Sequence, residues 1–158
     1  MKTILNSFLS ISLRAALRLL LLLTIALLVS SLRAQSATVT VSSSQVVAAT
    51  LILEAGGEGN VGMQAVREVI ANRAKNKTEM SVCLARKQFS CWNNISPEDG
   101  IAKAKRHPLW AVAVELAKNP VATNLTLGAT HYHTLKVSPS WKNSLTKTVR
   151  IRNHIFYK

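Results

Sequence analysis

The stretch LEAGGEGNVG at residues 53–62 interrupts a long region of helical periodicity, and this interruption limits the possible folds more than any other feature. Apolar residues recur at helical spacing on both sides of it. Inside a helix each glycine is about 1 kcal/mol less favourable than alanine, so three glycines within four residues end the first helix. The sequence therefore predicts two helices joined by a sharp turn, with Glu54 in the last turn of the first helix and Glu58 in the connection.

Capping residues predict the ends of these two helices. Ser43 or Ser44 is expected to cap the first helix, residues 45–55, and Asn60 is expected to cap the second, residues 61–75. The second helix has apolar and polar positions on opposite sides. Its expected buried positions are Val61, Ala65, Val69, Ala71 and Asn72, and its expected polar positions are Arg67, Glu68, Arg73 and Lys75.

Helices continue after this pair and then give way to other structure. Pro97 is expected to begin another helix and Pro108 the next, which ends before Pro120. Residues 119–141 have no helical period and contain β-branched residues, glycine and proline. The final segment, TKTVRIRNHIFYK, alternates polar and apolar residues as a strand does. The predicted fold class is α+β, predominantly helical, in a single domain with a short C-terminal β region.

The N-terminal residues have the features of a secretory signal peptide. Basic residues precede the apolar run Leu19–Val29, which is shorter than the roughly twenty residues of a membrane span. Small residues suited to cleavage follow at Ser30, Ser31 and Ala34. An uncleaved N-terminal anchor is the alternative. The expected organisation is a signal peptide at 1–34, a flexible lead-in at 35–43 and one domain at 44–158, exported to the periplasm or the extracellular space.

The chain is strongly basic, with 20 Lys and Arg against 7 Asp and Glu and a formal net charge of +13. Four of the basic residues lie in the expected signal peptide, so the exported domain keeps 16 against 7, a net charge of +9. This charge favours an anionic partner. The basic residues are scattered rather than clustered with aromatic residues, and with export this argues against nucleic acid as the partner.

The two cysteines, Cys83 and Cys91, are separated by seven residues. In an oxidising compartment so close a pair predicts a disulfide that closes a small loop. Two reduced, buried thiols are the alternative. A zinc site is not expected from two isolated cysteines.

The tract THYHTLKVSPSW is open to several interpretations. In a strand His131 and His133 would point to the same face, as metal ligands do, and His154 or a glutamate would complete a zinc site of a peptidase or amidase. The chain has no His-Glu-x-x-His motif to support that site. Alternatively, Tyr132, His133 and Trp141 line a saccharide groove or fill the core of a small sheet.

Four blocks of sequence, in this order, resemble the cell wall hydrolase family typified by the spore-cortex-lytic enzymes: LEAGGEGNVGMQAVREVIANR, VCLARKQFSCW, GATHYHTLKVSPSW and IRNHIFY. The family pattern has Glu-Ala-Arg-Gly-Glu, then Asn-Arg, then Gln-Phe-Ser before a tryptophan, then His-x-Phe-Tyr. The resemblance implies a lysozyme-like fold and cleavage of peptidoglycan glycan strands between N-acetylmuramic acid and N-acetylglucosamine. It implies no metal or organic cofactor.

Carried over by position, the resemblance makes Glu54 the catalytic acid and Glu58 the second acidic residue of the site. The residues expected to bind substrate or support the site are Gln88, Ser90, Trp92, His131, Tyr132, His133, Trp141 and His154. The chain departs from the pattern at Gly56, where the family usually has arginine, and at Arg152, where glycine is frequent. The first departure removes a cation beside the acids but leaves Glu54 in place.

The acidic residues favour one mechanism over another. Inverting and retaining glycosidases need two carboxylates at defined separations. This chain has few acids, and Glu58 is the one evident second carboxylate beside Glu54. A lytic transglycosylase needs only one carboxyl group, so we expect that mechanism. A hydrolytic muramidase that uses Glu54 and Glu58, or a non-catalytic wall-binding module, is the alternative. We expect a monomer whose partners are peptidoglycan and, through its charge, anionic wall polymers.

Overall fold

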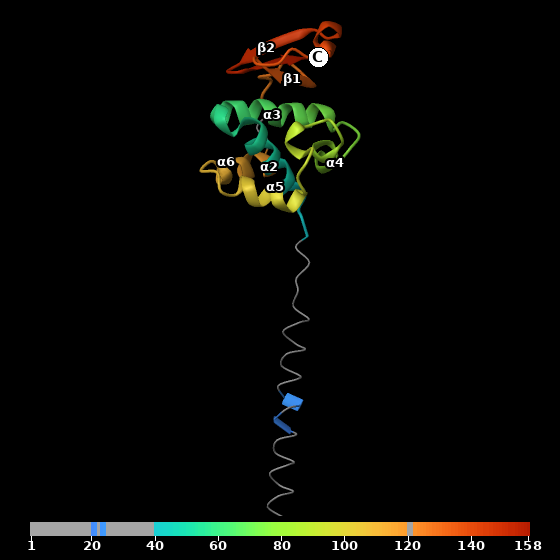
Figure 1. Cartoon of the computed structure of the whole chain (residues 1–158). Coiled ribbons are helices and arrows are strands. Elements are labelled where there is room, and N and C mark those ends of the chain that lie inside the picture. Colours follow the sequence, from blue (N-terminus) through green and yellow to red (C-terminus); the bar gives the residue numbers. More distant parts are fainter. Residues whose placement is uncertain (1–19, 22, 25–39, 120–121) are drawn as a thin grey trace, which may run out of the picture. The chain divides into compact units, whose positions relative to one another are not determined.

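The computed structural model describes residues 20–21, 23–24, 40–119 and 122–158 (Figure 1). Residues 41–158 form one unit, which contains the helices and strands below, and residues 1–40 form another. The expected signal peptide cleavage site, and the lead-in up to residue 39, lie outside the described residues. Within the described part of the chain, no helix is long and apolar enough to cross a membrane.

Helix α2 (Ser43–Ala55) lies at the centre of the helical layer, because it is apolar on every side. Its buried residues are Val46, Val47, Ala48, Ala49, Thr50, Leu51, Ile52 and Ala55. The helix begins two residues earlier than predicted. The capping residue is Ser42, whose hydroxyl accepts from the backbone N–H of Gln45 while the Gln45 side chain accepts from the Ser42 N–H.

The other helices and the short helical turns η1 and η2 surround α2 (Figure 1). They are η1 (Gly56–Glu58), α3 (Gly59–Arg73), α4 (Glu79–Leu84), η2 (Ser90–Trp92), α5 (Pro97–Ala104) and α6 (Trp110–Lys118). The predicted start at Pro97 is confirmed, with Ser96 as the cap. The sequence did not predict α4 or η2, because a helix of one or two turns has too few residues to establish a period.

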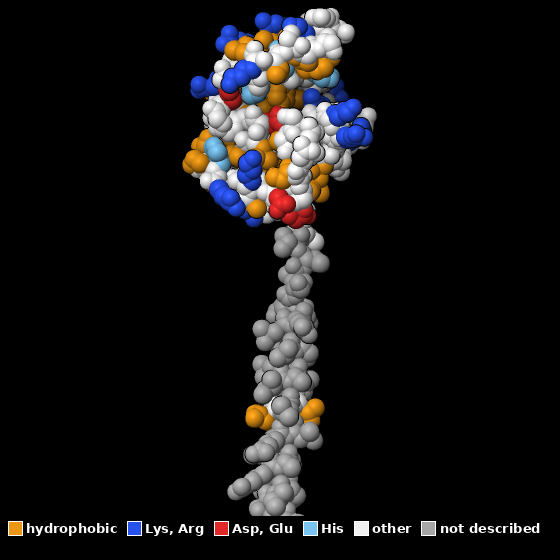
Figure 2. All heavy atoms as spheres, viewed as in Figure 1, with side chains coloured by type: hydrophobic (Ala, Val, Ile, Leu, Met, Phe, Trp, Pro, Cys, Tyr) orange, Lys and Arg blue, Asp and Glu red, His pale blue; other side chains and the backbone are white. Residues whose placement is uncertain are grey.

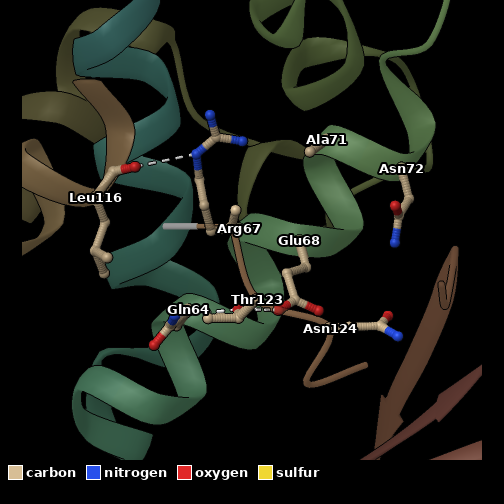
Figure 3. Close-up of a pocket in the computed structure, with 9 residues that line it drawn as sticks. Gln64, Arg67, Glu68, Ala71, Asn72, Leu116, Thr123 and Asn124 are labelled. Atoms are coloured by element: carbon tan, nitrogen blue, oxygen red, sulfur yellow. Dashed lines mark hydrogen bonds between the residues drawn. The ribbon is translucent and has the colours of Figure 1, made fainter. Parts of the chain in front are cut away.

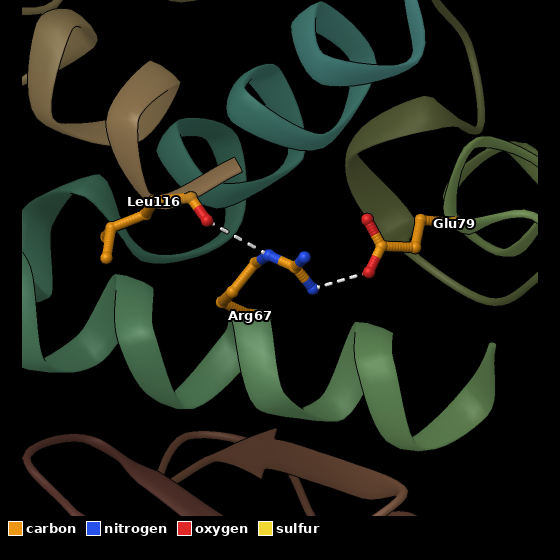
Figure 4. Close-up of polar contacts among 3 residues, drawn as sticks. All are labelled: Arg67, Glu79 and Leu116. Carbon is orange, nitrogen blue, oxygen red and sulfur yellow. Dashed lines mark hydrogen bonds and ion pairs between the residues drawn. The ribbon is translucent and has the colours of Figure 1, made fainter. Parts of the chain in front are cut away.

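Helix α3 differs from its prediction at its start and on its polar side. Glu58, rather than Asn60, occupies the capping position, and its side chain makes no capping bond. Val61 is 45% exposed, whereas Arg67 is buried. The Arg67 Nε donates to the carbonyl of Leu116 at 3.1 Å, and Nη1 lies 2.8 Å from the carboxylate of Glu79 (Figure 4). A buried guanidinium therefore joins α3 to α6 and α4.

A three-stranded antiparallel sheet completes the domain. Its strands are β1 (His131–Thr134), β2 (Lys147–Ile151) and β3 (His154–Tyr157), in the order β1-β3-β2, and η3 (Ser140–Ser144) precedes β2. The final segment is thus a hairpin and not the single strand predicted. Arg152 takes a positive φ of 48° in the turn. A positive φ is uncommon for arginine, so the sequence did not predict a turn at this position. The predicted α+β fold class, predominantly helical with a short C-terminal β region, is confirmed.

A small second core attaches the sheet to α3. It contains Ala65, Val69, Ala129 and Phe156, and Phe156 is 1% exposed. The side chain of Asn72 adds a polar link, because its Nδ2 donates to the carbonyl of Ala129 at 2.9 Å.

Glu68, which the sequence placed on an exposed helix side, fastens the segment before β1 to α3. Its carboxylate accepts from the hydroxyls of Thr123 and Thr126 and from the backbone N–H groups of Leu125 and Thr126. It borders a pocket of about 310 Å³. Figure 3 shows Glu68 of α3 beside Thr123 in this pocket. Partial burial acts to raise the pKa of Glu68. The hydrogen bonds lower the pKa by more than burial raises it, so the net shift is downward. The carboxylate is therefore a structural anchor.

Candidate active site

Glu54 lies in the last turn of α2, and three donors from other elements point at its carboxylate. The backbone N–H of Cys91 donates to Oε1 at 2.9 Å, and the Ser90 hydroxyl approaches the same oxygen at 3.4 Å. The Tyr132 hydroxyl donates to Oε2 at 2.8 Å. Both oxygens are thus held by groups 36 to 78 residues away in the chain, which fixes the direction of the carboxyl group.

The η2 segment is itself held in place from α2 and α5. The indole Nε1 of Trp92 donates to the Thr50 hydroxyl at 3.0 Å, and Thr50 is fully buried in α2. The Trp92 ring lies directly over Gly100, where an added Cβ would come within 2.3 Å of a ring carbon. A side chain at position 100 would displace the Trp92 ring. The absence of a side chain at Gly100 therefore allows η2 to pack closely against α5.

A cavity of about 510 Å³ opens at Glu54, between the end of α2, η2 and the sheet region. The residues that line it are Leu53, Glu54, Ser90, Cys91, Tyr132, His133, Thr134, Val137, Pro139, Trp141 and His154. One carboxylate, that of Glu54, is among them. The other six acidic residues of the chain, all of them described, lie outside this lining.

Aromatic and imidazole rings form the sheet side of the cavity. Tyr132 meets His154 edge to face at 5.1 Å between ring centroids, and His133 meets Trp141 at 5.8 Å. The His133 Nε2 and the Tyr157 hydroxyl are 3.0 Å apart. The two readings of this tract, groove lining and core filling, therefore apply together: His133 is 8% exposed, yet it borders the cavity.

The pKa shifts of these groups define what they can donate. Burial raises the pKa of Tyr132 well above its ordinary value of 10, and the Glu54 carboxylate raises it further, so the phenol stays protonated. Burial lowers the pKa of His154, an effect that Glu58 and Glu54 only partly oppose. At neutral pH the His154 ring is neutral, with one nitrogen as a donor and the other as an acceptor.

Residues 57–157 match the sequence profile of the family described as Cell Wall Hydrolase. The match covers more than half of the chain and includes every lining residue of the cavity except Leu53 and Glu54. The chain belongs to the cell wall hydrolase family. A comparison with curated proteins finds no match.

Two solved structures are similar to this cell wall hydrolase. The catalytic domain of the germination-specific lytic transglycosylase SleB from Bacillus anthracis is 25% identical, with a TM-score of 0.59 over 73% of this chain and 93% of that one. The catalytic domain of the Bacillus cereus SleB protein is 22% identical, with a TM-score of 0.51 over 73% of this chain and 89% of that one. The second likeness bears on the fold alone.

Three residues expected in the site of the hydrolase lie beside the cavity rather than in its lining. Gln88 is exposed, and its carbonyl accepts from Arg73 Nη1 at 3.1 Å. Trp92 holds η2 from behind, as described above. His131 packs against Trp141 with ring centroids 5.3 Å apart, and its pKa is lowered by burial and by the nearby Arg73 cation.

Glu58, expected as the second acid, is bound to the hairpin turn of the sheet. Its Oε2 accepts from the Asn153 backbone N–H and its Oε1 from the Asn153 side chain, both at 3.1 Å. Desolvation acts to raise the pKa of Glu58, but the Asn153 hydrogen bonds, with smaller contributions from His154 and Arg152, give a net downward shift. The carboxylate is engaged in joining η1 to the sheet.

We expect Glu58→Gln to keep most of the wall-cleaving activity while lowering stability in a pH-dependent way. A carboxylate whose folded-state pKa lies below its ordinary value of 4.5 adds stability above that pH, and this contribution is lost as the pH falls through the folded-state pKa. Thermal unfolding of both proteins between pH 3 and pH 7 measures the difference, which should shrink toward the acidic end. Complete loss of activity in a folded Glu58→Gln protein would contradict this prediction.

The predicted disulfide is not formed: both cysteines are free thiols in the structure. Cys83 is buried in the helical core, and burial raises its pKa to about 11. Cys91 borders the Glu54 cavity, and burial together with the Glu54 carboxylate raises its pKa strongly. Because the thiolate is the reactive form, Cys91 is unsuited to act as a nucleophile at neutral pH.

The zinc alternative finds no support from the described residues, which include no group of three or more His, Cys, Asp or Glu side chains arranged to hold a metal ion. His133 instead faces Tyr157 and Trp141. Gly56, the departure from the family pattern, lies against His107, and an added Cβ would be 3.1 Å from its Nε2. The imidazole thus approaches the backbone closely at the position where the family usually has arginine.

Sequence reasoning missed several residues that support the site. Thr50 positions Trp92, Asn153 holds Glu58, and Arg73 joins the carbonyls of Thr130 and Gln88. The Arg73 guanidinium also lies 4.9 Å from the centre of the Phe89 ring. The Asn-Arg pair at the end of α3 was the one signal available, and it gave no indication of these partners.

Proposed function

We propose that this cell wall hydrolase cleaves the glycan strands of peptidoglycan between N-acetylmuramic acid and N-acetylglucosamine as a lytic transglycosylase. Glu54 is the acid and then the base of the reaction. The observation that carries this proposal is that Glu54 is the single carboxylate lining a ring-bordered cavity. The likeness to the Bacillus anthracis enzyme, whose name describes a lytic transglycosylase, supports it.

The reaction needs one carboxyl group and no water. Glu54 donates its proton to the glycosidic oxygen, and the bond from that oxygen to C1 of the muramyl residue breaks. The muramyl C6 hydroxyl attacks C1, its proton passes to Glu54, and a 1,6-anhydro ring forms. The carboxyl group ends the cycle protonated, as it began. The fixed direction of the Glu54 carboxyl group favours both proton transfers at one place.

Hydrolysis would make a different demand on the protein. An inverting glycosidase needs a second carboxylate about 6.5–9.5 Å from the acid to activate water, and a retaining enzyme needs a carboxylate at about 5–5.5 Å as the nucleophile. The candidate, Glu58, is occupied by two hydrogen bonds from Asn153 and is not part of the cavity lining. This arrangement favours transglycosylation over hydrolysis.

The rings around the cavity fit a saccharide substrate. Trp141 and Tyr132 offer flat apolar faces and edges, and the neutral His154 ring can both donate to and accept from sugar hydroxyls. We assign Ser90 and His133 to the same binding surface. The proposed substrate and the proposed signal peptide over residues 1–34 support a location in the periplasm or outside the cell, with one catalytic domain over residues 44–158.

The test is the mass of the products. Purified peptidoglycan is digested with the protein, and the soluble fragments are identified by mass spectrometry. Transglycosylation gives fragments lighter by one water than the corresponding hydrolysis products, with no new reducing ends. Reducing muramic acid ends would reassign the protein to hydrolysis, and the absence of any released fragment would favour a wall-binding module.

A further inference from the structure

A second cavity, of about 430 Å³, adjoins the Glu54 cavity across η2. Phe89 and Trp92 line the second cavity, while the two residues between them, Ser90 and Cys91, line the first. The two cavities therefore share one short wall.

The loop that borders the second cavity is held in a strained conformation. The Gln88 N–H donates to the Ala85 carbonyl at 3.1 Å and closes a turn in which Lys87 has a positive φ of 65°. For a residue with a side chain, this left-handed conformation costs on the order of 1 kcal/mol or more, and glycine would avoid that cost. Lysine at a position where glycine would be less strained suggests that the lysine side chain has a function.

The same loop is fixed from behind by Arg73. Its Nη1 donates to the Gln88 carbonyl at 3.1 Å, and its guanidinium lies over the Phe89 ring at 4.9 Å. The loop is thereby fastened to the end of α3, next to the element that positions Glu54. The charges of Arg86 and Lys87 are held at the rim of the cavity rather than on a free loop.

The rim charges form no salt bridge within the described part of the chain. In the described part of the chain the one salt bridge joins Arg67 to Glu79, so Arg86 and Lys87 are not neutralised by a carboxylate. Both are exposed, whereas Phe89 is 2% exposed at the inner wall. Figure 2 shows basic side chains gathered at this edge of the domain, beside α4. A cationic rim over an aromatic wall fits a carboxylate carried on a short chain.

We propose that this second cavity binds the acidic peptide stem attached to the muramyl residue, with Arg86 and Lys87 contacting its carboxylates. The inference rests on the proposed function, because the stem belongs to the strand whose glycan occupies the Glu54 cavity. The reach agrees: Cys91 and Phe89 are two residues apart, so their Cα atoms are separated by no more than roughly 7 Å, and an extended stem of three to five residues spans roughly 10–18 Å. Glycan stripped of stems by an amidase keeps only the lactyl carboxylate on the muramyl ring and loses every carboxylate of the peptide.

The experiment measures binding without cleavage. Full-length protein with Glu54→Gln is titrated with soluble glycan chains that carry intact stems, with the same chains stripped of stems by an amidase, and with chains whose stem carboxylates are amidated. We expect intact chains to bind about tenfold more tightly than either of the other two. Arg86→Gln combined with Lys87→Gly should reduce the affinity for intact chains to that of stripped chains and leave the latter unchanged.

A matched control separates this site from the overall charge. Lys103→Gln with Lys105→Gln removes the same charge from exposed positions at the end of α5 that do not border the cavity. Equal losses in the two pairs, or equal affinity for intact and stripped chains, would overturn the proposal. Lys87→Gly alone should raise the melting temperature, because it relieves the positive φ, so weaker binding cannot be ascribed to misfolding.

The proposed function can fail separately. If wild-type protein releases no fragment from peptidoglycan while the Glu54→Gln protein still distinguishes intact from stripped chains, the peptide-stem site stands and the cleavage assignment falls. If an anionic phosphate polymer displaces intact and stripped chains equally, the basic rim serves general charge attraction, and the peptide-stem site is wrong.

Discussion

Replacing Glu54 with glutamine is expected to lower the release of soluble peptidoglycan fragments by at least about 10²- to 10⁴-fold, the contribution typical of general acid–base catalysis. Glutamine keeps the shape of the side chain: its oxygen can still accept from the Cys91 N–H, and its NH2 can donate to the Tyr132 hydroxyl. It has no acidic proton to give to the glycosidic oxygen. Initial rates on purified peptidoglycan, with fragments quantified by mass spectrometry, measure the loss. The folded state should survive the change.

The matched control is Glu115→Gln, which makes the same chemical change on the exposed side of α6. Glu115 accepts from the Asn119 side chain at 2.8 Å and does not border the cavity. Its substitution should leave the rate within about twofold of wild type, since exposed substitutions away from special features alter stability little. A Glu54→Gln protein that digests the wall as fast as the Glu115→Gln protein would refute the assignment of Glu54.

Glu79→Ala is expected to lower the free energy of unfolding by about 2–3 kcal/mol. The Arg67 side chain is 5% exposed, so removal of the Glu79 carboxylate leaves a buried cation with the Leu116 carbonyl as its remaining acceptor. Breaking a fully buried pair costs about 3–5 kcal/mol, and the estimate here is smaller because the Glu79 side chain is 30% exposed. For a domain of this size the melting temperature should fall by about 10 °C, measured by calorimetry or circular dichroism.

Glu98→Ala is the control for this loss. Glu98 and Glu79 both lie in the first turn of a helix, where a carboxylate is favoured by the helix dipole, but Glu98 is exposed and forms no salt bridge among the described residues. The control should cost no more than about 1 kcal/mol. Equal effects of the two substitutions would mean that Arg67 does not depend on Glu79.

The sequence predicted the helices wherever the determining physics is local. The glycines after Glu54 end α2, and Pro97 begins α5, because backbone preference at those positions does not depend on the rest of the chain. The predicted helix boundaries were less accurate. Ser42, Ser43 and Ser44 are consecutive, and the sequence did not show that Ser42 is the residue that caps α2. The hairpin between β2 and β3 was missed, because its turn uses Arg152 and Asn153 rather than glycine.

Hydrogen bonds between residues distant in sequence could not be predicted from helical periodicity. Periodicity assigned Arg67 and Glu68 to the polar side of α3, but Arg67 reaches a carbonyl 49 residues away and Glu68 binds a segment more than 50 residues away. Glu58 was expected beside Glu54 as an acid, yet a residue 95 positions later holds its carboxylate. Burial of these charges is favourable only once their partners have been brought close, which the packing of α3 between α6 and the sheet accomplishes.

By itself, the sequence determined where Glu54 would lie, at the end of an apolar helix stopped by glycine, and it determined the family through four ordered blocks. Only the tertiary structure decided that Glu54 is the single carboxylate in its cavity and that Tyr132 and Cys91 fix its direction. The reason is physical. A helix end depends on backbone energies within a few residues, whereas the surroundings of a carboxyl group depend on contacts formed when distant segments pack together.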